Sequence, residues 1–396
     1  MALRIPEAKD VTRKKVLVRV DFNVPIKNGV VSDDTRIKAH LETLRFLKEN
    51  GAFITLISHL GRPKEGRDPE FSLKPVAEYL SNLTGWTVNF IPDCIGEAVE
   101  GAVASQLQDE IIVLENVRFY KEETKNDPSF AEKLAKPFEV FVMDAFSAAH
   151  RAHASTRGVA DYLKSFAGFL IKKEIESLSV VRDNPTHPYV LILGGAKVSD
   201  KIGVIENLLP KVDHILIGGG MAYTFLKAKG YGIGKSLCEE DKIEYANKLI
   251  SLSQVKGVKI HLPLDCVATL EAKADVPTIV IDTETSIPDD MMGLDIGPKT
   301  IKAFCEVIKE AKTIFWNGPM GVFELEPFRS GTEKVAIAVA DVAKRGGYAV
   351  VGGGDTAAAV NVFGLSDQMT HVSTGGGASL EFMEGKMLPG IEPLLD

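Results

Sequence analysis

The chain has 396 residues, of which 45% are hydrophobic and 25% charged, an ordinary composition for a globular protein of two or three domains. This composition excludes a disordered chain, a collagen-like repeat and a coiled coil. The 46 basic and 54 acidic residues give a net charge of −8. That balance disfavours nucleic acid as the main partner, because proteins that bind phosphate backbones carry a basic excess.

The cysteines and the N-terminal sequence predict a cytoplasmic protein. Cys94, Cys238, Cys266 and Cys305 are far apart and lack the spacing of a zinc site, and such dispersed cysteines are typical of a reducing compartment. The first residues contain no apolar segment of a secretion signal. No apolar run approaches the roughly 20 residues that span a bilayer, so we expect no membrane partner.

Short runs rich in valine and isoleucine alternate with longer amphipathic segments. Continuous apolar strands separated by helices predict an α/β fold of two Rossmann-like domains, each a parallel sheet flanked by helices. Ligands of such sheets bind at the carboxyl ends of the strands. The predicted strands cover residues 16–20, 53–57, 111–114, 140–143, 190–193, 215–217, 313–316 and 349–351.

The residues that follow these strands divide the chain near residue 170. Ten arginines lie in residues 1–169 and three in 170–396, whereas nine glycines lie in the first part and 26 in the second. The first part holds 23 basic and 24 acidic residues, and the second holds 23 and 30. We therefore expect two domains of different binding character, joined by a hinge helix over residues 170–182.

Glycine-rich turns end the strands of the second part, at 194–195, 218–220, 352–354 and 375–377. Such turns let a ligand approach the backbone, and the following helix offers unpaired N–H groups to a phosphate, so four of them favour a nucleotide. Lys197 and Lys201 are spaced by four residues, which predicts one face of a helix that opens after residue 195. Asp355 at another helix start could cap that helix or hold Mg²⁺ beside a phosphate.

Two other nucleotide motifs fit less well. GKS at 234–236 matches the end of a P-loop, but Lys229 stands where that motif needs glycine, so we reject it. Residues 352–357 fit G-x-G-x-x-A, but Val372 stands where an acidic ribose partner is expected. An NAD-dependent dehydrogenase therefore stays open as an alternative, and so does a non-catalytic protein that closes on an anion.

Arginines and histidines gather near the strand ends of the first part. Arginine suits two-point recognition of carboxylates and phosphates, so a small molecule with several negative charges is the expected ligand. Together with a nucleotide in the other domain, this predicts phosphoryl transfer, in which closure about the hinge excludes water. The residues concerned are Arg36, Arg62, Arg118, Arg151, His59, His150 and His153.

At this level of detail the sequence resembles the phosphoglycerate kinases, in order and over essentially its whole length. One departure is Ser147, where that family often has glycine, and serine would be strained there if the position had a positive φ. The motifs that carry the resemblance are VLVRVDFNVP at 16–25, SHLGRP at 58–63, ENVRF at 115–119, HRAHAS at 150–155, GGAKVSDK at 194–201, GGGMA at 218–222, WNGPMG at 316–321, GGGDT at 352–356 and TGGGAS at 374–379.

The resemblance implies a monomeric glycolytic kinase that transfers the acyl phosphate of 1,3-bisphosphoglycerate reversibly to Mg-ADP, giving 3-phosphoglycerate and ATP. Residues 1–169, with a tail at 388–396 packed back on them, would bind phosphoglycerate, and residues 170–387 the nucleotide. Arg36, Lys197, Gly353 and Gly376 would act at the transfer site, and Asp355 would meet Mg²⁺. The substrate contacts would be Asp21, Phe22, Asn23, Arg36, His59, Leu60, Gly61, Arg62, Arg118 and Arg151. The nucleotide contacts would be Lys201, Gly218, Gly219, Gly293, Leu294, Asn317, Pro319, Glu324, Gly353, Gly354, Asp355 and Thr356.

Overall fold

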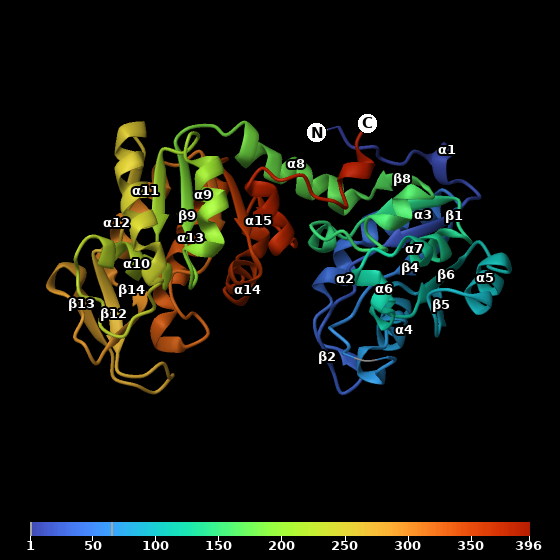
Figure 1. The fold of residues 1–396 in the computed structure, drawn as a ribbon, viewed down its shortest axis with the longest axis horizontal. Coiled ribbons are helices and arrows are strands. Elements are labelled where there is room, and N and C mark those ends of the chain that lie inside the picture. The colour runs from blue at the N-terminus through green and yellow to red at the C-terminus, as the bar shows by residue number, and fades with distance from the viewer. Residues whose placement is uncertain (1, 65) are drawn as a thin grey trace. The chain divides into compact units, whose positions relative to one another are not determined.

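A computed structural model describes residues 2–64 and 66–396, which divide into two compact units (Figure 1). Unit 1 contains the chain up to Glu176 together with Met387–Asp396, and unit 2 is Ser177–Lys386. Both are mixed α/β structures around a parallel sheet, as predicted. Within the described residues, no helix combines the length and the apolar character needed to cross a bilayer.

Unit 1 is built on a six-stranded sheet in the order β5-β6-β4-β1-β7-β8, with every neighbouring pair parallel. The four inner strands are the four predicted for this part, and their apolar side chains are buried on both faces, as a covered parallel sheet requires. The two outer strands were not predicted, because edge strands carry more polar residues. The strands are β1 (Lys15–Arg19), β4 (Phe53–Ile57), β5 (Thr87–Ile91), β6 (Glu110–Leu114), β7 (Val140–Met143) and β8 (Lys164–Ala167).

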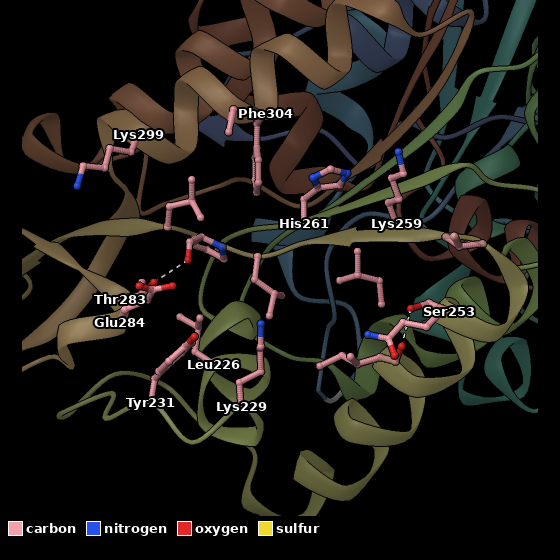
Figure 2. A pocket seen from close by; sticks show the side chains of 18 of the residues that line it. Leu226, Lys229, Tyr231, Ser253, Lys259, His261, Thr283, Glu284, Lys299 and Phe304 are labelled. Carbon is pink, nitrogen blue, oxygen red and sulfur yellow. Dashed lines mark hydrogen bonds between the residues drawn. The ribbon is translucent and has the colours of Figure 1, made fainter.

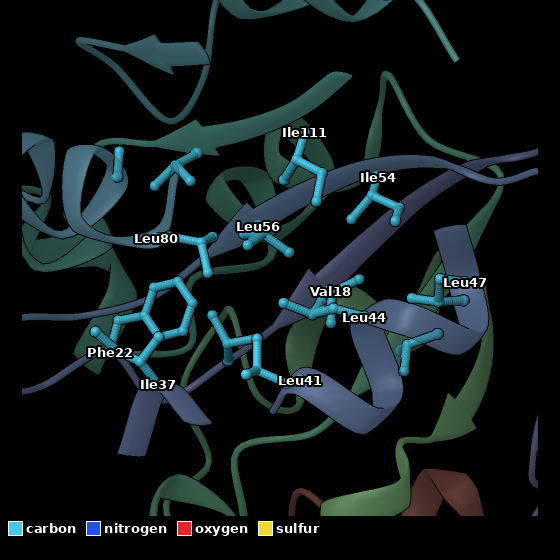
Figure 3. Packing of buried hydrophobic residues seen from close by; sticks show 14 of the residues in the cluster. Val18, Phe22, Ile37, Leu41, Leu44, Leu47, Ile54, Leu56, Leu80 and Ile111 are labelled. Atoms are coloured by element: carbon cyan, nitrogen blue, oxygen red, sulfur yellow. The ribbon is translucent and has the colours of Figure 1, made fainter. Parts of the chain in front are cut away.

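One core cluster of unit 1 lies between this sheet and the helices on one of its faces (Figure 3). Val18 of β1 and Leu56 of β4 face Leu44 of α3 and Leu80 of α4, and all four side chains are buried. The helices of this unit are α1 (Ala8–Val11), α2 (Thr35–Ala39), α3 (Leu41–Glu49), α4 (Lys74–Thr84), α5 (Glu97–Ala104), α6 (Lys121–Thr124), α7 (Pro128–Ala135) and the first part of α8 (Phe169–Asp183), and a short hairpin joins β2 (Ile26–Lys27) to β3 (Val30–Val31).

Unit 2 repeats this plan with the strand order β11-β10-β9-β15-β16-β17, again all parallel. A second, antiparallel sheet has the order β13-β12-β14. The strands are β9 (Tyr189–Leu193), β10 (His214–Ile217), β11 (Lys259–His261), β12 (Asp265–Thr269), β13 (Ile279–Asp282), β14 (Met292–Ile296), β15 (Thr313–Asn317), β16 (Tyr348–Gly352) and β17 (His371–Val372).

The helices of unit 2 bury apolar stripes against its sheets. Trp316 of β15 and Phe304 of α12 belong to one buried cluster that also includes Val335 and Val339 of α13. The helices are α9 (Ile202–Leu208), α10 (Met221–Ala228), α11 (Ile243–Lys256), α12 (Pro298–Glu310), α13 (Ser330–Lys344), α14 (Gly354–Val362) and α15 (Gly377–Met383).

The boundary between the units falls inside α8, which the sequence predicts over 170–182. The end of the chain returns to unit 1 (Figure 1). There Leu395 forms an antiparallel bridge with Leu3, and the Gly390 N–H donates to the Ala149 carbonyl at 2.8 Å. The tail therefore touches the loop that follows β7.

Candidate active site

Three of the predicted substrate arginines line one cavity of unit 1. Arg62 follows β4, Arg118 lies in a 3₁₀ turn after β6, and Arg151 follows β7, so the carboxyl ends of parallel strands bring them together. None of the three forms an ion pair with a described residue. The cavity has a volume of about 420 Å³ and is lined by Arg62, Pro63, Arg118, Tyr120, Lys121, Thr124, Lys125, Arg151 and His153.

Asp21 lies just after β1 with only 4% of its surface exposed. Its Oδ2 accepts a hydrogen bond from Arg36 Nη1 at 2.9 Å and another from the Ser147 hydroxyl. Its Oδ1 accepts the Asn23 N–H at 3.1 Å. The Asp21 N–H donates to His40 Nε2 at 2.8 Å, so the residue is held at both its backbone and its carboxylate.

The loop after β4 is fixed from both sides by residues predicted to bind substrate. The Gly61 N–H donates to Asn23 Oδ1 at 2.8 Å, and Arg118 Nη1 donates to the Gly61 carbonyl at 2.7 Å. Gly61 has a φ of +61°, and a Cβ built there would lie 2.3 Å from the Phe71 ring, so this turn requires glycine. The side chains of Phe22 and Leu60 are buried in the core, so only their backbones could face a polar ligand.

The side chain of His59 belongs to a buried hydrogen-bond network that was not predicted from the sequence. The Arg19 guanidinium donates to His59 Nδ1 at 3.1 Å and to Ser155 Oγ at 2.8 Å, and Ser155 donates to Glu123 at 2.6 Å. Because guanidinium only donates, Nδ1 must accept, which leaves the imidazole proton on Nε2. Arg19 gave one usable signal, since it is the one charged residue of the predicted strand over residues 16–20.

The charges around the cavity repel one another. Burial, together with Arg118 and Arg19, lowers the pKa of His153 to about 4, and burial together with Arg19 and Arg151 lowers the pKa of Arg118 to about 10. Burial and four arginines also hold the pKa of His59 well below its usual value, so both histidines are neutral at pH 7. Arg118 Nε is buried without a hydrogen-bond partner among the described residues. A bound anion would reduce the repulsion between these positive charges and would accept a hydrogen bond from Arg118 Nε.

In unit 2 two of the predicted glycine turns, at 194–195 and 218–220, pack against the loop that follows β15. The Gly195 N–H donates to the Pro319 carbonyl at 2.9 Å, and the Gly219 N–H donates to the Met320 carbonyl at 3.0 Å. A Cβ on Gly194 would lie 2.1 Å from the Pro319 carbonyl oxygen. Much of the glycine enrichment in these turns therefore reflects close contact between loops. Gly354 and Gly376 differ, because a Cβ there would meet open space, so their backbones are free to receive a ligand.

Lys201 is buried at the end of the sheet, where its Nζ donates to Asn317 Oδ1. Burial lowers the pKa of Lys201, and the nearby carboxylates of Asp200 and Asp355 oppose that shift. The prediction that Lys197 shares a helix face with Lys201 is wrong. The carboxylate of Glu239 accepts the N–H groups of residues 198 and 199, so helical structure begins only at Ser199, and Lys197 lies in the exposed bend before it.

Other segments of unit 2 hold Gly293 and Leu294, two of the predicted nucleotide contacts. The Gly293 N–H donates to Ser236 Oγ at 2.9 Å, and the Leu294 carbonyl accepts the N–H of residue 322 at 2.9 Å. GKS at 234–236, rejected as a P-loop, thus supports Gly293 instead. Leu237 was not predicted, yet it is 60% exposed and lies against Gly220. An exposed leucine inside a glycine-lined site is suited to cover the face of a base, and Pro319 and Glu324 lie on the loop after β15.

Asp355 lies in the first turn of α14, with its side chain exposed. The helix is capped by Gly353 at a φ of +91°, so the interpretation of Asp355 as the cap is wrong. Thr356 is buried, and its hydroxyl accepts the Gly318 N–H at 2.7 Å. No group of three or more His, Cys, Asp or Glu within the described ranges could hold a metal ion. A single carboxylate still suits Mg²⁺ that arrives with phosphate oxygens.

Comparison with known proteins identifies the family to which this chain belongs. A family model described as phosphoglycerate kinase matches residues 6–386. The chain belongs to the phosphoglycerate kinase family. Phosphoglycerate kinases of Thermosipho africanus and Dictyoglomus turgidum are 55% and 54% identical to it, over 96% and 98% of this chain and 95% and 97% of theirs. The solved phosphoglycerate kinase of Coxiella burnetii matches with a TM-score of 0.85 at 44% identity, over 97% of this chain and 96% of that one.

Membership of the phosphoglycerate kinase family makes the chain a kinase, in agreement with the predicted enzyme class and with glycolytic phosphoryl transfer. The alternatives of an NAD-dependent dehydrogenase and of a non-catalytic binding protein are wrong. The curated relatives and the solved structure match nearly the full length of this chain, so the family applies to both units.

A larger cavity of about 890 Å³ lies elsewhere in unit 2 (Figure 2). His261 and Lys259 of the edge strand β11 line it, together with Phe304 of α12 and the end of α10 at Lys229. None of the residues predicted to bind the nucleotide lines this cavity. The cavity and the predicted nucleotide contacts therefore lie in different parts of unit 2.

Proposed function

We propose that the protein transfers the acyl phosphate of 1,3-bisphosphoglycerate to Mg-ADP, reversibly, with 3-phosphoglycerate and ATP as products. The observation that carries this proposal is the cavity lined by Arg62, Arg118 and Arg151, none of which forms an ion pair with a described residue. A site that concentrates unpaired guanidinium groups at a sheet edge is suited to a small phosphorylated carboxylate. The names of its relatives support the same substrate.

In this proposal unit 1 binds the phosphoglycerate. The three cavity arginines bind its phosphate, and His59, whose Nε2 carries the proton, donates a further hydrogen bond. Asp21 and Asn23 bind and orient the glycerate. Arg36 has one guanidinium nitrogen committed to Asp21 and to the Asn23 carbonyl, which leaves its other donors for the reacting carboxyl-phosphate.

Unit 2 binds the nucleotide. Leu237, Gly293, Leu294 and Pro319 enclose the base, and Glu324 is available for the ribose hydroxyls. The phosphates approach the first turn of α14, where Gly354 leaves room for them, and the cation Lys201 is fixed nearby by Asn317. Asp355 would hold Mg²⁺ together with the phosphate oxygens, and the ion would neutralise part of their charge.

Catalysis in this site needs no general base. A carboxylate accepts the phosphoryl group in the ATP-consuming direction and an ADP oxygen accepts it in the other, and both are ionised at pH 7. The protein has to screen several negative charges and hold the reacting groups in line. We assign that work to Arg36 and Lys197, with the backbones of Gly353 and Gly376 at the transfer site.

The proposal also covers the oligomeric state of the protein, its location in the cell and its domain motion. We propose a monomer of the cytoplasm that closes about α8 to exclude water, without nucleic acid as a partner. The four cysteines are all free, which supports a reducing compartment.

The test is a coupled assay of ATP formation from 1,3-bisphosphoglycerate and ADP. Arg36→Ala and Lys197→Ala should each lower kcat by at least tenfold, a barrier change of about 1.4 kcal/mol. Matched controls are Arg157→Ala, whose arginine pairs with Asp161, and Lys334→Ala on an exposed helix position, and both should retain kcat. Retention of kcat within about twofold by both test variants would contradict the assignment, and folded wild-type protein that makes no ATP would overturn the function.

A further inference from the structure

The carboxylate of Asp21 has almost all of its acceptor positions occupied by the protein. An ionised carboxylate offers about four acceptor positions, two on each oxygen. Oδ2 receives Arg36 Nη1 and the Ser147 hydroxyl, and Oδ1 receives the Asn23 N–H. One position therefore remains, on Oδ1. The side chain is 6% exposed, so it can gain little hydration to replace a lost partner.

Ser147 reaches Asp21 from a different strand end. It lies in the 3₁₀ turn Phe146–Ala148 that follows β7, whereas Asp21 follows β1, the neighbouring strand. Its φ is not positive, so the backbone strain considered for a serine here does not arise. The hydroxyl that distinguishes serine from the glycine frequent at this position is the group that contacts Asp21.

We propose that Ser147 is a positioning residue, whose hydroxyl orients the Asp21 carboxylate so that its one free acceptor position receives the 2-hydroxyl of the glycerate. Without this hydrogen bond Oδ2 keeps only Arg36, whose side chain is 40% exposed and flexible. The carboxylate can then rotate about its terminal torsion, which has a broad energy profile. Orientation lost before binding has to be restored during binding, and this weakens affinity. The inference rests on the proposed function, since it takes Asp21 as a substrate contact.

The test combines two ligands with a set of variants in calorimetric titrations. The ligands are 3-phosphoglycerate and its analogue without the 2-hydroxyl, 3-phosphooxypropanoate. Ser147→Ala should raise the Kd of 3-phosphoglycerate about tenfold, the size expected for a hydrogen bond to a charged group, and that of the analogue less than twofold. Ser147→Thr, which keeps a hydroxyl, should restore part of the affinity. Ser105→Ala, which removes a hydroxyl bonded only within its own helix end, is the matched control and should change neither Kd.

Equal weakening of both ligands by Ser147→Ala would show a general loosening of the loop and overturn the proposal, as would no weakening of either. Asp21→Ala separates this failure from that of the proposed function. If Asp21→Ala weakens 3-phosphoglycerate while Ser147→Ala does not, the substrate site stands and the role of Ser147 is wrong. If Asp21→Ala leaves both Kd values unchanged, Asp21 is no substrate contact, and the substrate site as proposed fails together with the inference.

Discussion

In unit 1 most candidate ligand contacts are side chains, chiefly arginines carried on loops at the strand ends, whereas in unit 2 many are main-chain groups of glycine turns. The first kind of site gathers like charges and needs buried counter-charges and hydrogen bonds beneath them, such as Glu123 under Arg19. The second kind needs close approach between loops and little net charge. The two candidate sites are thus vulnerable to opposite changes, the removal of a charge in one unit and the addition of a methyl group in the other.

The largest effect is expected for Glu123→Gln in unit 1. Glu123 is fully buried, and burial raises its pKa, while the charge of Arg19 and hydrogen bonds from Ser155 favour its ionised form. Neutralising it leaves Arg19 as an uncompensated buried charge, a change that costs about 3–5 kcal/mol in comparable cases. The free energy of unfolding, measured with urea, should fall by that amount. A loss below about 1 kcal/mol would show that Arg19 needs no counter-charge. Glu122→Gln on the exposed side of the same turn is the control.

Two variants test whether particular glycines of unit 2 are needed for packing or for ligand binding. Gly194→Ala puts a Cβ 2.1 Å from a backbone oxygen, and this overlap should lower stability by about 1–3 kcal/mol and weaken ADP binding. Gly354→Ala meets no neighbour, so it should keep the melting temperature and weaken ADP binding alone, because the methyl group occupies the space of the phosphates. Thermal melting and ADP titration of both variants check this. Equal destabilisation by the two would contradict the distinction between packing glycines and ligand glycines.

A smaller effect concerns pH. The pKa of His153 is about 4 in the folded protein, below the 6.5 of an unperturbed histidine, so the unfolded chain binds more protons between these values. The contribution of His153 to the free energy of unfolding is therefore complete above pH 6.5 and is lost as the pH falls to about 4. His153→Gln should reduce the loss of melting temperature over that range. An unchanged profile would mean that neither burial nor the arginines around the cavity disfavour a charge at His153.

The sequence predicted those parts of the molecule that local patterns determine. The inner strands and α8 followed from apolar runs and amphipathic spacing, and the arginine clustering followed from the rule that ligands bind at strand ends. Lys197 was misplaced because the start of the helical turn at Ser199 depends on Glu239, which is distant in sequence. Arg19, Leu237 and the contact of Ser147 with Asp21 were missed for the same reason. Their roles depend on contacts between residues that are separated in sequence, and of the three only Arg19, as a charged residue within a predicted apolar strand, gave a local signal.

The return of the tail to unit 1 has a consequence for how the protein is made. Unit 2 is one uninterrupted stretch of chain, but unit 1 is completed by Met387–Asp396, which follow the whole of unit 2 in the sequence. Domains generally fold as units during synthesis, from the N-terminus onwards. Here the loop that carries Arg151 lacks its Gly390 partner until residues 387–396 have been synthesised, so this loop reaches its final support only after the whole of unit 2 has been synthesised.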